Sequence, residues 1–237
     1  MKIPRPPHNW QVSPRRAAAI QQELARAVRQ EQPAGELRLV AGVDAAFVTD
    51  PPACLAGVVL WDSASGTVLE SHTARRPLLF PYVPGLLSFR EAPAIIAALR
   101  RLRRTPDALL VDGQGLAHPR RFGIACHLGL LTGLPSVGCA KSRLIGSFQM
   151  PGEKRGDYSL LVDRQDTIGA VLRTRDHVRP LFISIGHAID LDHAIELTLA
   201  CGCGYRLPEP TRLADRLVAS ERSKTRIRST IRRPDPA

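Results

Sequence analysis

Short apolar runs alternate with helical stripes along this 237-residue chain. Residues 37–48 and 54–62 are each largely apolar, and a Ser-Ala-Ser-Gly turn then leads to a third run at 67–73. Runs of this length with such short connections predict three consecutive antiparallel strands. An acid, Asp44, stands in the middle of the first strand, where a core residue would be expected.

The middle of the chain predicts a helix followed by a buried strand. Residues 86–104 carry apolar side chains at helical spacing, with Glu91 at the margin of the apolar stripe. Pro93 must kink this helix or mark its effective start. The uncharged run at 108–111 is typical of a strand buried on both faces, and it ends at Asp112.

Asp112 opens a Gly-Gln-Gly turn, in which backbone amides can approach a ligand with no Cβ in the way. Pro119, directly after His118, suits a first helical position, so the pattern predicts a helix from Pro119 to about Gly133. An acid at the end of a parallel strand, facing a glycine loop and a helix N-terminus, lies where open α/β sheets bind ligands. The alternative is an acid that merely caps the turn.

The remaining segments extend the same pattern. A short buried strand at 136–140 ends at Lys141. Further elements are expected at 14–29 (helix), 158–162 and 168–174 (hairpin), 181–185 (strand), 190–200 (helix) and from Glu209 (helix). We expect a single domain over residues 1–220. From Glu221 basic residues dominate with few apolar ones, which predicts a disordered basic tail over 221–237.

Charge and cysteine content narrow the class of protein. Lys and Arg (33) outnumber Asp and Glu (22), giving a net charge of +11, which favours nucleic acid as a partner ahead of an acidic membrane. A solvated basic surface would carry the same charge. The five cysteines form no paired CxxC pattern, so we expect reduced thiols. With no bilayer-spanning run and no signal-peptide core, we expect a cytoplasmic monomer without membrane contact.

Three acids far apart in the sequence fall on elements that one sheet would bring together. Asp44 lies on the first strand, Glu91 on the first core helix and Asp112 at the end of the fourth strand. This is the layout of the ribonuclease-H-like fold, an α/β class with three antiparallel strands, then parallel strands, flanked by helices. Acids in that fold converge on divalent metal ions, and carboxylates are the ligands that Mg²⁺ prefers. In-line phosphodiester cleavage uses such ions at both the attacking and the leaving oxygen.

Five segments in order also resemble the endonuclease V family, from about residue 40 to 217. They are Val40-Ala-Gly-Val-Asp44, Phe80-Pro-Tyr-Val-Pro-Gly-Leu-Leu-Ser-Phe-Arg-Glu91, Asp112-Gly-Gln-Gly-Leu-Ala-His-Pro-Arg120, Gly138-Cys-Ala-Lys-Ser-Arg-Leu-Ile-Gly146 and Pro208-Glu-Pro-Thr-Arg-Leu-Ala-Asp215. The resemblance implies a Mg²⁺-dependent endonuclease, with Mn²⁺ as a substitute, that recognises deoxyinosine in DNA. It implies a cut at the second phosphodiester bond 3′ to the lesion, leaving 3′-hydroxyl and 5′-phosphate ends.

The same resemblance implies roles for the residues at the reacting centre. Asp44 and Asp112 would bind the metal directly, and Glu91 would be a further ligand or would position water. Asp215 would be a fourth carboxylate or a base. Lys141 would meet the scissile phosphate, although a solvated surface lysine is the simpler interpretation.

A second group would handle the altered base and the DNA backbone. Tyr82, held between prolines, would wedge into the base stack, unless it packs back on the core. His118 and Arg120 would hold phosphates from the helix N-terminus. His187 could equally be a core histidine. The other residues expected at the base pocket or the DNA surface are Pro81, Val83, Gly85, Leu87, Gly113 and Ser142.

Three other functions compete with this one. An actin-like ATPase or sugar kinase shares the strand order, but it needs a Gly/Thr-rich phosphate loop after the first acid, and Ala-Ala-Phe follows Asp44. A non-catalytic nucleic-acid-binding module would explain the charge but gives no reason for acids on buried elements. The same nuclease chemistry could instead act on inosine in RNA.

Overall fold

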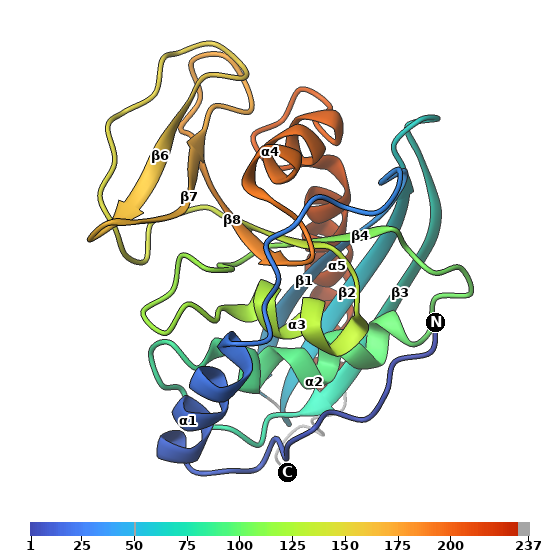
Figure 1. Ribbon diagram of the computed structural model, residues 1–237. Coiled ribbons are helices and arrows are strands. Elements are labelled where there is room, and N and C mark those ends of the chain that lie inside the picture. The colour runs from blue at the N-terminus through green and yellow to red at the C-terminus, as the bar shows by residue number, and fades with distance from the viewer. Residues whose placement is uncertain (50, 232–237) are drawn as a thin grey trace.

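One mixed sheet runs through the centre of the molecule (Figure 1). The computed structural model describes residues 1–49 and 51–231, with side chains up to residue 224. The strands are β1 Leu39–Thr49, β2 Pro52–Asp62, β3 Thr67–Pro77, β4 Ala108–Val111, β5 Ser136–Ala140, β6 Tyr158–Asp163, β7 Asp166–Leu172 and β8 Leu181–His187. The helices are α1 Pro14–Ala25, α2 Leu87–Leu99, α3 Ile124–Thr132, α4 Leu191–Ala200 and α5 Glu209–Ile231.

The strand order is β3-β2-β1-β4-β5-β8-β7-β6. β1, β2 and β3 form the expected antiparallel meander, and β4 pairs parallel with both β1 and β5. β8 returns antiparallel to β5, and the β6–β7 hairpin completes the sheet. This arrangement confirms the ribonuclease-H-like mixed sheet with flanking helices.

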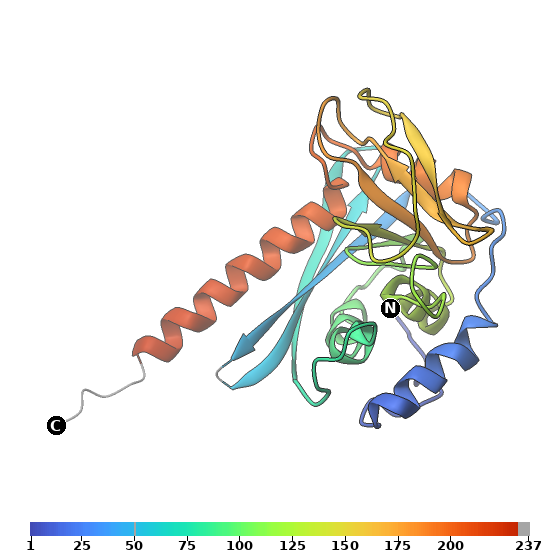
Figure 2. The same cartoon turned by 90° about the vertical axis from the view of Figure 1, so that its left-hand side faces the viewer.

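Alternating side chains of the central strands are buried on opposite faces of the sheet. Val43 of β1 and Leu109 of β4 belong to one apolar cluster, whereas Val40 and Leu110 belong to another. α2 packs on β2 and β3 and α3 on β5 and β8, while α5 crosses β1 and β2 from the opposite side (Figure 2). Because both faces are covered, the central strands read as continuous apolar runs.

The predicted helix from Pro119 was wrong at its start, because α3 begins only at Ile124. Residues between β4 and α3 form turns instead, and Arg121 has a positive φ of 52°. Gly115 and Gly123 hold these turns tightly together: a Cβ on Gly123 would lie 2.1 Å from the carbonyl oxygen of Gln114. This backbone packing outweighs the preference of Pro119 for a first helical position.

α5 continues well past the point where the basic tail was expected to begin. The helix runs through Glu221 to Ile231, and an ion pair joins Glu221 to Lys224 at 2.6 Å. Arg, Lys and Glu are good helix formers, so a segment with few apolar residues can still extend an anchored helix. The last part of the expected tail, 232–237, lies outside the described residues.

Neither a disulfide bond nor a membrane-spanning helix is found in the described part of the chain. All five cysteines are free, and four of them are buried, while Cys203 is exposed. Among the described helices, none is long and apolar enough to cross a bilayer.

The two edges of the sheet differ in how they are finished. β3 presents Arg75, Arg76 and Pro77 at its exposed end. β6 is bridged on its outer side by Ser147, whose backbone exchanges two hydrogen bonds with Val162 (2.7 and 2.9 Å). Both features bear on contacts with other chains.

The contact between β1 and α5 leaves no space for a side chain at Gly42. A Cβ there would lie 2.1 Å from the carbonyl carbon of Pro210, so backbone would have to move. We expect Gly42→Ala to cost about 3 kcal/mol and to lower Tm by about 6–12 °C. Gly35→Ala is the control, because nothing lies within 4 Å of its Cβ position. Equal melting temperatures for the two variants would contradict this account of the contact.

Candidate active site

The parallel pairing of β1 with β4 places two acids side by side. Val43 pairs with Val111, so Asp44 and Asp112 occupy the next positions on the two strands. The amide of Asp112 donates to the carbonyl of Val43 at 3.5 Å, which extends the pairing to the end of β4. Side chains alternate along each strand, so both carboxylates project to the same side of the sheet.

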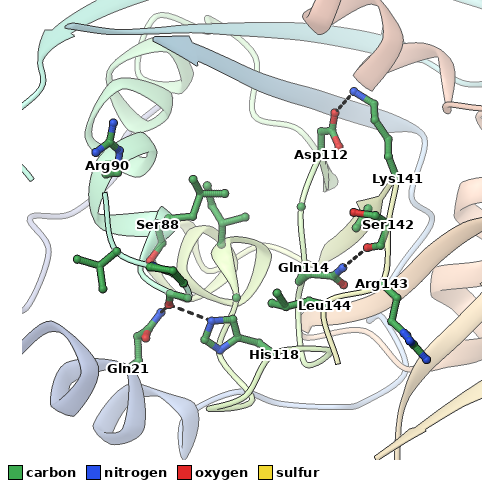
Figure 3. A pocket seen from close by; sticks show the side chains of 18 of the residues that line it. Gln21, Ser88, Arg90, Asp112, Gln114, His118, Lys141, Ser142, Arg143 and Leu144 are labelled. Carbon is green, nitrogen blue, oxygen red and sulfur yellow. Dashed lines mark hydrogen bonds and ion pairs between the residues drawn. The ribbon is translucent and has the colours of Figure 1, made fainter. Parts of the chain in front are cut away.

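Lys141 and Asp215 reach this pair from neighbouring elements. Lys141 directly follows β5, and its Nζ lies 2.5 Å from Oδ2 of Asp112 (Figure 3). Asp215 lies on α5 and contributes to the electrostatic environment of Asp44. Lys141, which was predicted to meet the scissile phosphate, is therefore an ion-pair partner of the acid at the strand end.

Burial and neighbouring negative charge hold protons on two of the acids. Burial raises the pKa of Asp44 to about 7, with further contributions from Asp112 and Asp215, while Lys141 opposes the rise. Burial also raises the pKa of Glu91, on α2, to about 8, and the charges of Asp44 and Asp112 add to this. The three acids far apart in sequence thus act on one another across one small region.

These acids suit a hard divalent cation. Their donors are all carboxylate oxygens, and burial, with the charges of the neighbouring acids added, raises the pKa of Asp44 and of Glu91, so a bound cation would be favoured there. Within the described part of the chain, no three His, Cys, Asp or Glu side chains are close enough to hold an ion by themselves.

A pocket of about 370 Å³ opens beside the acids and shares residues with them (Figure 3). Asp112 and Lys141 form one part of its wall, and the loop from Tyr82 to Gly85 forms another. The turn after β4 contributes Gly113. Volumes of this order accommodate small organic groups, so the pocket can hold one nucleobase next to the carboxylates.

Three side chains from distant parts of the chain hold the pocket loop at one atom. The carbonyl oxygen of Gly85 accepts hydrogen bonds from Gln21 Nε2 (3.1 Å), His118 Nε2 (3.0 Å) and an Arg120 guanidinium nitrogen (2.7 Å). Burial lowers the pKa of His118 to about 4, with Arg120 adding to the effect, so the ring is neutral. His118 and Arg120 therefore position a loop. The prediction that they stand at a helix N-terminus is wrong, because α3 begins only at Ile124.

The other predicted recognition residues divide between the pocket and its surroundings. Tyr82 is 74% exposed, so it does not pack back on the core, and Arg90 lies over its ring at 5.8 Å. His187 is buried and accepts from the amide of Arg29 at 3.3 Å, which matches the core interpretation. Residues expected at the pocket that do line it are Tyr82, Val83, Gly85, Leu87, Gly113, His118, Lys141 and Ser142; Pro81 and Arg120 do not.

Several lining residues were missed from the sequence. Ser88 and Arg90 lie within residues 80–91, one of the segments that resemble the family, and Gln114 stands between Gly113 and Gly115, so the sequence held a signal for all three. Gln114 Nε2 donates to the carbonyl of Ser142 at 2.9 Å and joins the two sides of the pocket. Gln21, on α1, gave no signal, because a lone glutamine on a basic helix is ordinarily solvated.

Known proteins match this chain over most of its length. A family model described as Endonuclease V matches residues 22–216. The Endonuclease V of Geotalea uraniireducens is 51% identical over 205 residues, covering 86% of each chain. That of Roseiflexus sp. is 50% identical over 213 residues, covering 90% of this chain and 95% of the relative.

Solved structures carry the same fold. Endonuclease V from Streptomyces avermitilis has a TM-score of 0.87 at 43% identity, covering 92% of this chain and 97% of the other. The catalytic domain of human Endonuclease V has a TM-score of 0.82 at 34% identity, covering 89% and 96%. The Ciona intestinalis protein, solved with a 23mer DNA containing an inosine followed by a ribo-adenosine, shares the fold with a TM-score of 0.79, 23% identity and coverage of 90% and 100%.

The acidic centre lies on a ribonuclease-H-like sheet beside a base-sized pocket, and the family match shows that the protein is a nuclease, a hydrolase acting on phosphodiester bonds. The family model covers residues 22–216, which is most of the chain. The chain belongs to the Endonuclease V family.

The raised pKa values predict how the stability of the metal-free protein depends on pH. Folded Asp44 and Glu91 keep their protons to about pH 7 and 8, whereas the unfolded chain releases them near pH 4. The folded state then binds more protons, so stability falls as pH rises, by up to about 1.4 kcal/mol per pH unit and group.

Asp44→Asn should remove one of these contributions. In chelator we expect the variant and the parent to melt alike at about pH 3, below the pKa of the unfolded acid, and the variant to become progressively more stable than the parent between about pH 4 and pH 7. Asp192→Asn, which changes an exposed acid on α4, controls for net charge. Parallel pH profiles for Asp44→Asn and the parent would show that the Asp44 pKa is ordinary.

Proposed function

We propose that this protein is a Mg²⁺-dependent DNA repair endonuclease that recognises deaminated bases, above all deoxyinosine. It nicks the second phosphodiester bond 3′ to the lesion, leaving a 3′-hydroxyl and a 5′-phosphate. Membership of a family of metal-dependent nucleases supports the reaction class. The inosine-containing DNA bound by the Ciona intestinalis protein supports the choice of lesion, and the net charge of +11 supports a nucleic acid substrate.

One observation carries the proposal: the pocket and the acidic centre share Asp112 and Lys141. A base extruded into the pocket would therefore keep its own strand against the carboxylates. Recognition of a base and cleavage of a nearby phosphodiester bond then follow from a single binding event. A purely binding module would have no need of Asp112 at that wall, or of Asp44 and Glu91 in the same acidic centre.

Each group at the centre has a defined task in this reaction. Asp44 and Asp112 would hold the cation, with Glu91 as a further ligand or a water-positioning group. When bound, the ion lowers the pKa of the attacking water and neutralises charge at the leaving oxygen. Lys141, already beside Asp112, would meet the scissile phosphate, and Asp215 would serve as a fourth carboxylate or a base.

The loop before α2 supplies the means of extruding the base. Tyr82 is largely exposed, while Gly85 a few residues later is held by three hydrogen bonds. An exposed ring on an anchored loop can insert into the base stack without the loop yielding. The neighbouring Pro81, Val83 and Leu87 would contact the DNA around the lesion.

The deciding experiment compares deoxyinosine DNA, inosine RNA and undamaged controls, each with and without Mg²⁺, and maps the cut. We expect a nick two bonds 3′ to deoxyinosine that requires Mg²⁺ or Mn²⁺. Cleavage of the RNA in preference to the DNA would assign the same chemistry to inosine in RNA. Metal-independent cleavage, or binding without cleavage, would overturn the proposal.

Asp112→Asn should abolish nicking while leaving affinity for the lesion largely intact. The substitution keeps the side-chain volume and removes a ligand charge at the end of β4. Cleavage and DNA binding are measured on the same folded protein, with Asp192→Asn as the matched change on α4. Near-normal nicking by Asp112→Asn would remove Asp112 from the metal site.

Tyr82→Ala should weaken discrimination between deoxyinosine DNA and normal DNA more than it slows the chemical step. Loss of one stacking or inserting aromatic costs about 1–3 kcal/mol. Tyr158→Ala is the control, because it removes a ring that is also exposed but lies on β6, away from the pocket. Unchanged affinities for both DNAs would show that Tyr82 does not act as a wedge.

A further inference from the structure

A chain of hydrogen bonds runs from the N-terminal segment through the core to the pocket wall. His8 Nε2 lies 2.8 Å from His127 Nε2, and His127 Nδ1 lies 3.0 Å from the hydroxyl of Ser88. Ser88 is 2% exposed, and it lines the pocket from the first turn of α2 (Figure 3). None of these three residues has a task in the cleavage chemistry described above.

The hydrogen bond of His8 to Asn9, at the outer end of this series of hydrogen bonds, determines which atom carries each proton. His8 Nδ1 is 3.0 Å from the backbone carbonyl of Asn9, which can only accept, so Nδ1 carries the proton. In a neutral ring the other nitrogen, Nε2, is then an acceptor. His127 must therefore donate from its Nε2, which leaves its Nδ1 as an acceptor, and Ser88 must donate to it.

Burial keeps both rings in the neutral form that this assignment requires. It lowers the pKa of His127 to about 3, and His8 adds to the effect. Burial also lowers the pKa of His8, more than its bond to Asn9 raises it. Phe89 and Trp10 both lie against the two imidazole rings, so the rings have aromatic neighbours.

A serine hydroxyl has one proton and two lone pairs. Because the proton of Ser88 is committed to His127, the oxygen can offer the pocket only acceptor capacity. We propose that Ser88 Oγ accepts the N1–H of an extruded hypoxanthine and so makes the pocket select this base over adenine. The inference rests on the proposed function, since hypoxanthine is the base of deoxyinosine.

The chemistry of the two purines gives the selection its direction. Hypoxanthine carries a hydrogen on N1, whereas N1 of adenine is an acceptor. Adenine would therefore place a lone pair against an oxygen that has no proton to give, and neither atom would gain a hydrogen bond. A freely rotating serine could serve either base, so the selection depends on His127 and on His8 beyond it.

The test compares single-turnover cleavage of DNA containing deoxyinosine with DNA containing the deoxynucleoside of unsubstituted purine, which lacks the N1–H. Ser88→Ala should lower cleavage of the deoxyinosine DNA about tenfold, the value of one hydrogen bond, and should change cleavage of the purine DNA by less than about twofold. Equal losses on both substrates would show that Ser88 has only a structural role, and the proposal would fail.

His8→Phe tests the proton assignment without touching the pocket wall. It keeps an aromatic ring beside Trp10 and Phe89 but removes the acceptor that holds the His127 proton on Nε2. The ratio of the single-turnover cleavage rate on deoxyinosine DNA to that on purine DNA should fall several-fold in His8→Phe. This ratio should fall no further when His8→Phe is added to Ser88→Ala. Additive effects, or an unchanged ratio in His8→Phe, would overturn the relay.

Two control variants, and cleavage of deoxyinosine DNA by the parent protein, distinguish failure of this inference from failure of the proposed function. Ser65→Ala and His177→Phe make the same changes at exposed positions outside the pocket and should leave the ratio unchanged. If Ser88→Ala does not fold, His8→Phe alone decides. If the parent protein cuts deoxyinosine DNA but these ratios do not move, only this inference fails; if it cuts no deoxyinosine DNA, the proposed function fails with it.

Discussion

The parallel register of β1 on β4 is the constraint on which the site depends. It sets Asp44 beside Asp112 at the point where the ladder ends. Backbone hydrogen bonds fix this placement, so the repulsion between two partly buried carboxylates cannot separate them. Burial, with the charge of Asp112 added, instead raises the pKa of Asp44, and the site therefore has an affinity for positive charge. Lys141 satisfies part of it, and the remainder is available to a cation.

A second constraint acts at a single carbonyl oxygen. Gly85 joins α1 and the turns after β4 to the loop that carries Tyr82. Gly85 has a positive φ of 76°, and an added Cβ would lie 2.8 Å from Arg120, so no other residue fits easily. The recognition loop is thus held from the side opposite the acids. These bonds fix the loop relative to α1 and to the turns after β4, as the proposed cut at a fixed distance from a recognised base would require.

The sequence was informative where local patterns and chain topology coincide. The uncharged run of β4 and the misplaced acid of β1 predicted both the sheet and the Asp44–Asp112 pair. Contacts that depend on side chains far apart in sequence left no periodic signal: His8 meets His127 across 119 positions. Local signals also failed where packing outweighed them, as at Pro119, where tight glycine turns delay the helix. The basic composition after Glu221 predicted a disordered tail, whereas α5 continues to Ile231. Charged residues such as Arg, Lys and Glu readily extend a helix that is anchored at its start.

The edges of the sheet determine how the molecule behaves among its own copies. A strand edge is a template for any extended chain that reaches it. At β3 the template is spoiled by arginines and a proline, which add charge and remove a donor. At β6 the protein uses its own chain: Ser147 occupies the hydrogen-bonding groups of Val162. This bridge by Ser147 is important because β6 exposes the apolar side chains of Tyr158 and Leu160, which would favour association with another strand. Both edges are thereby protected against pairing with the sheet of a second copy of the protein.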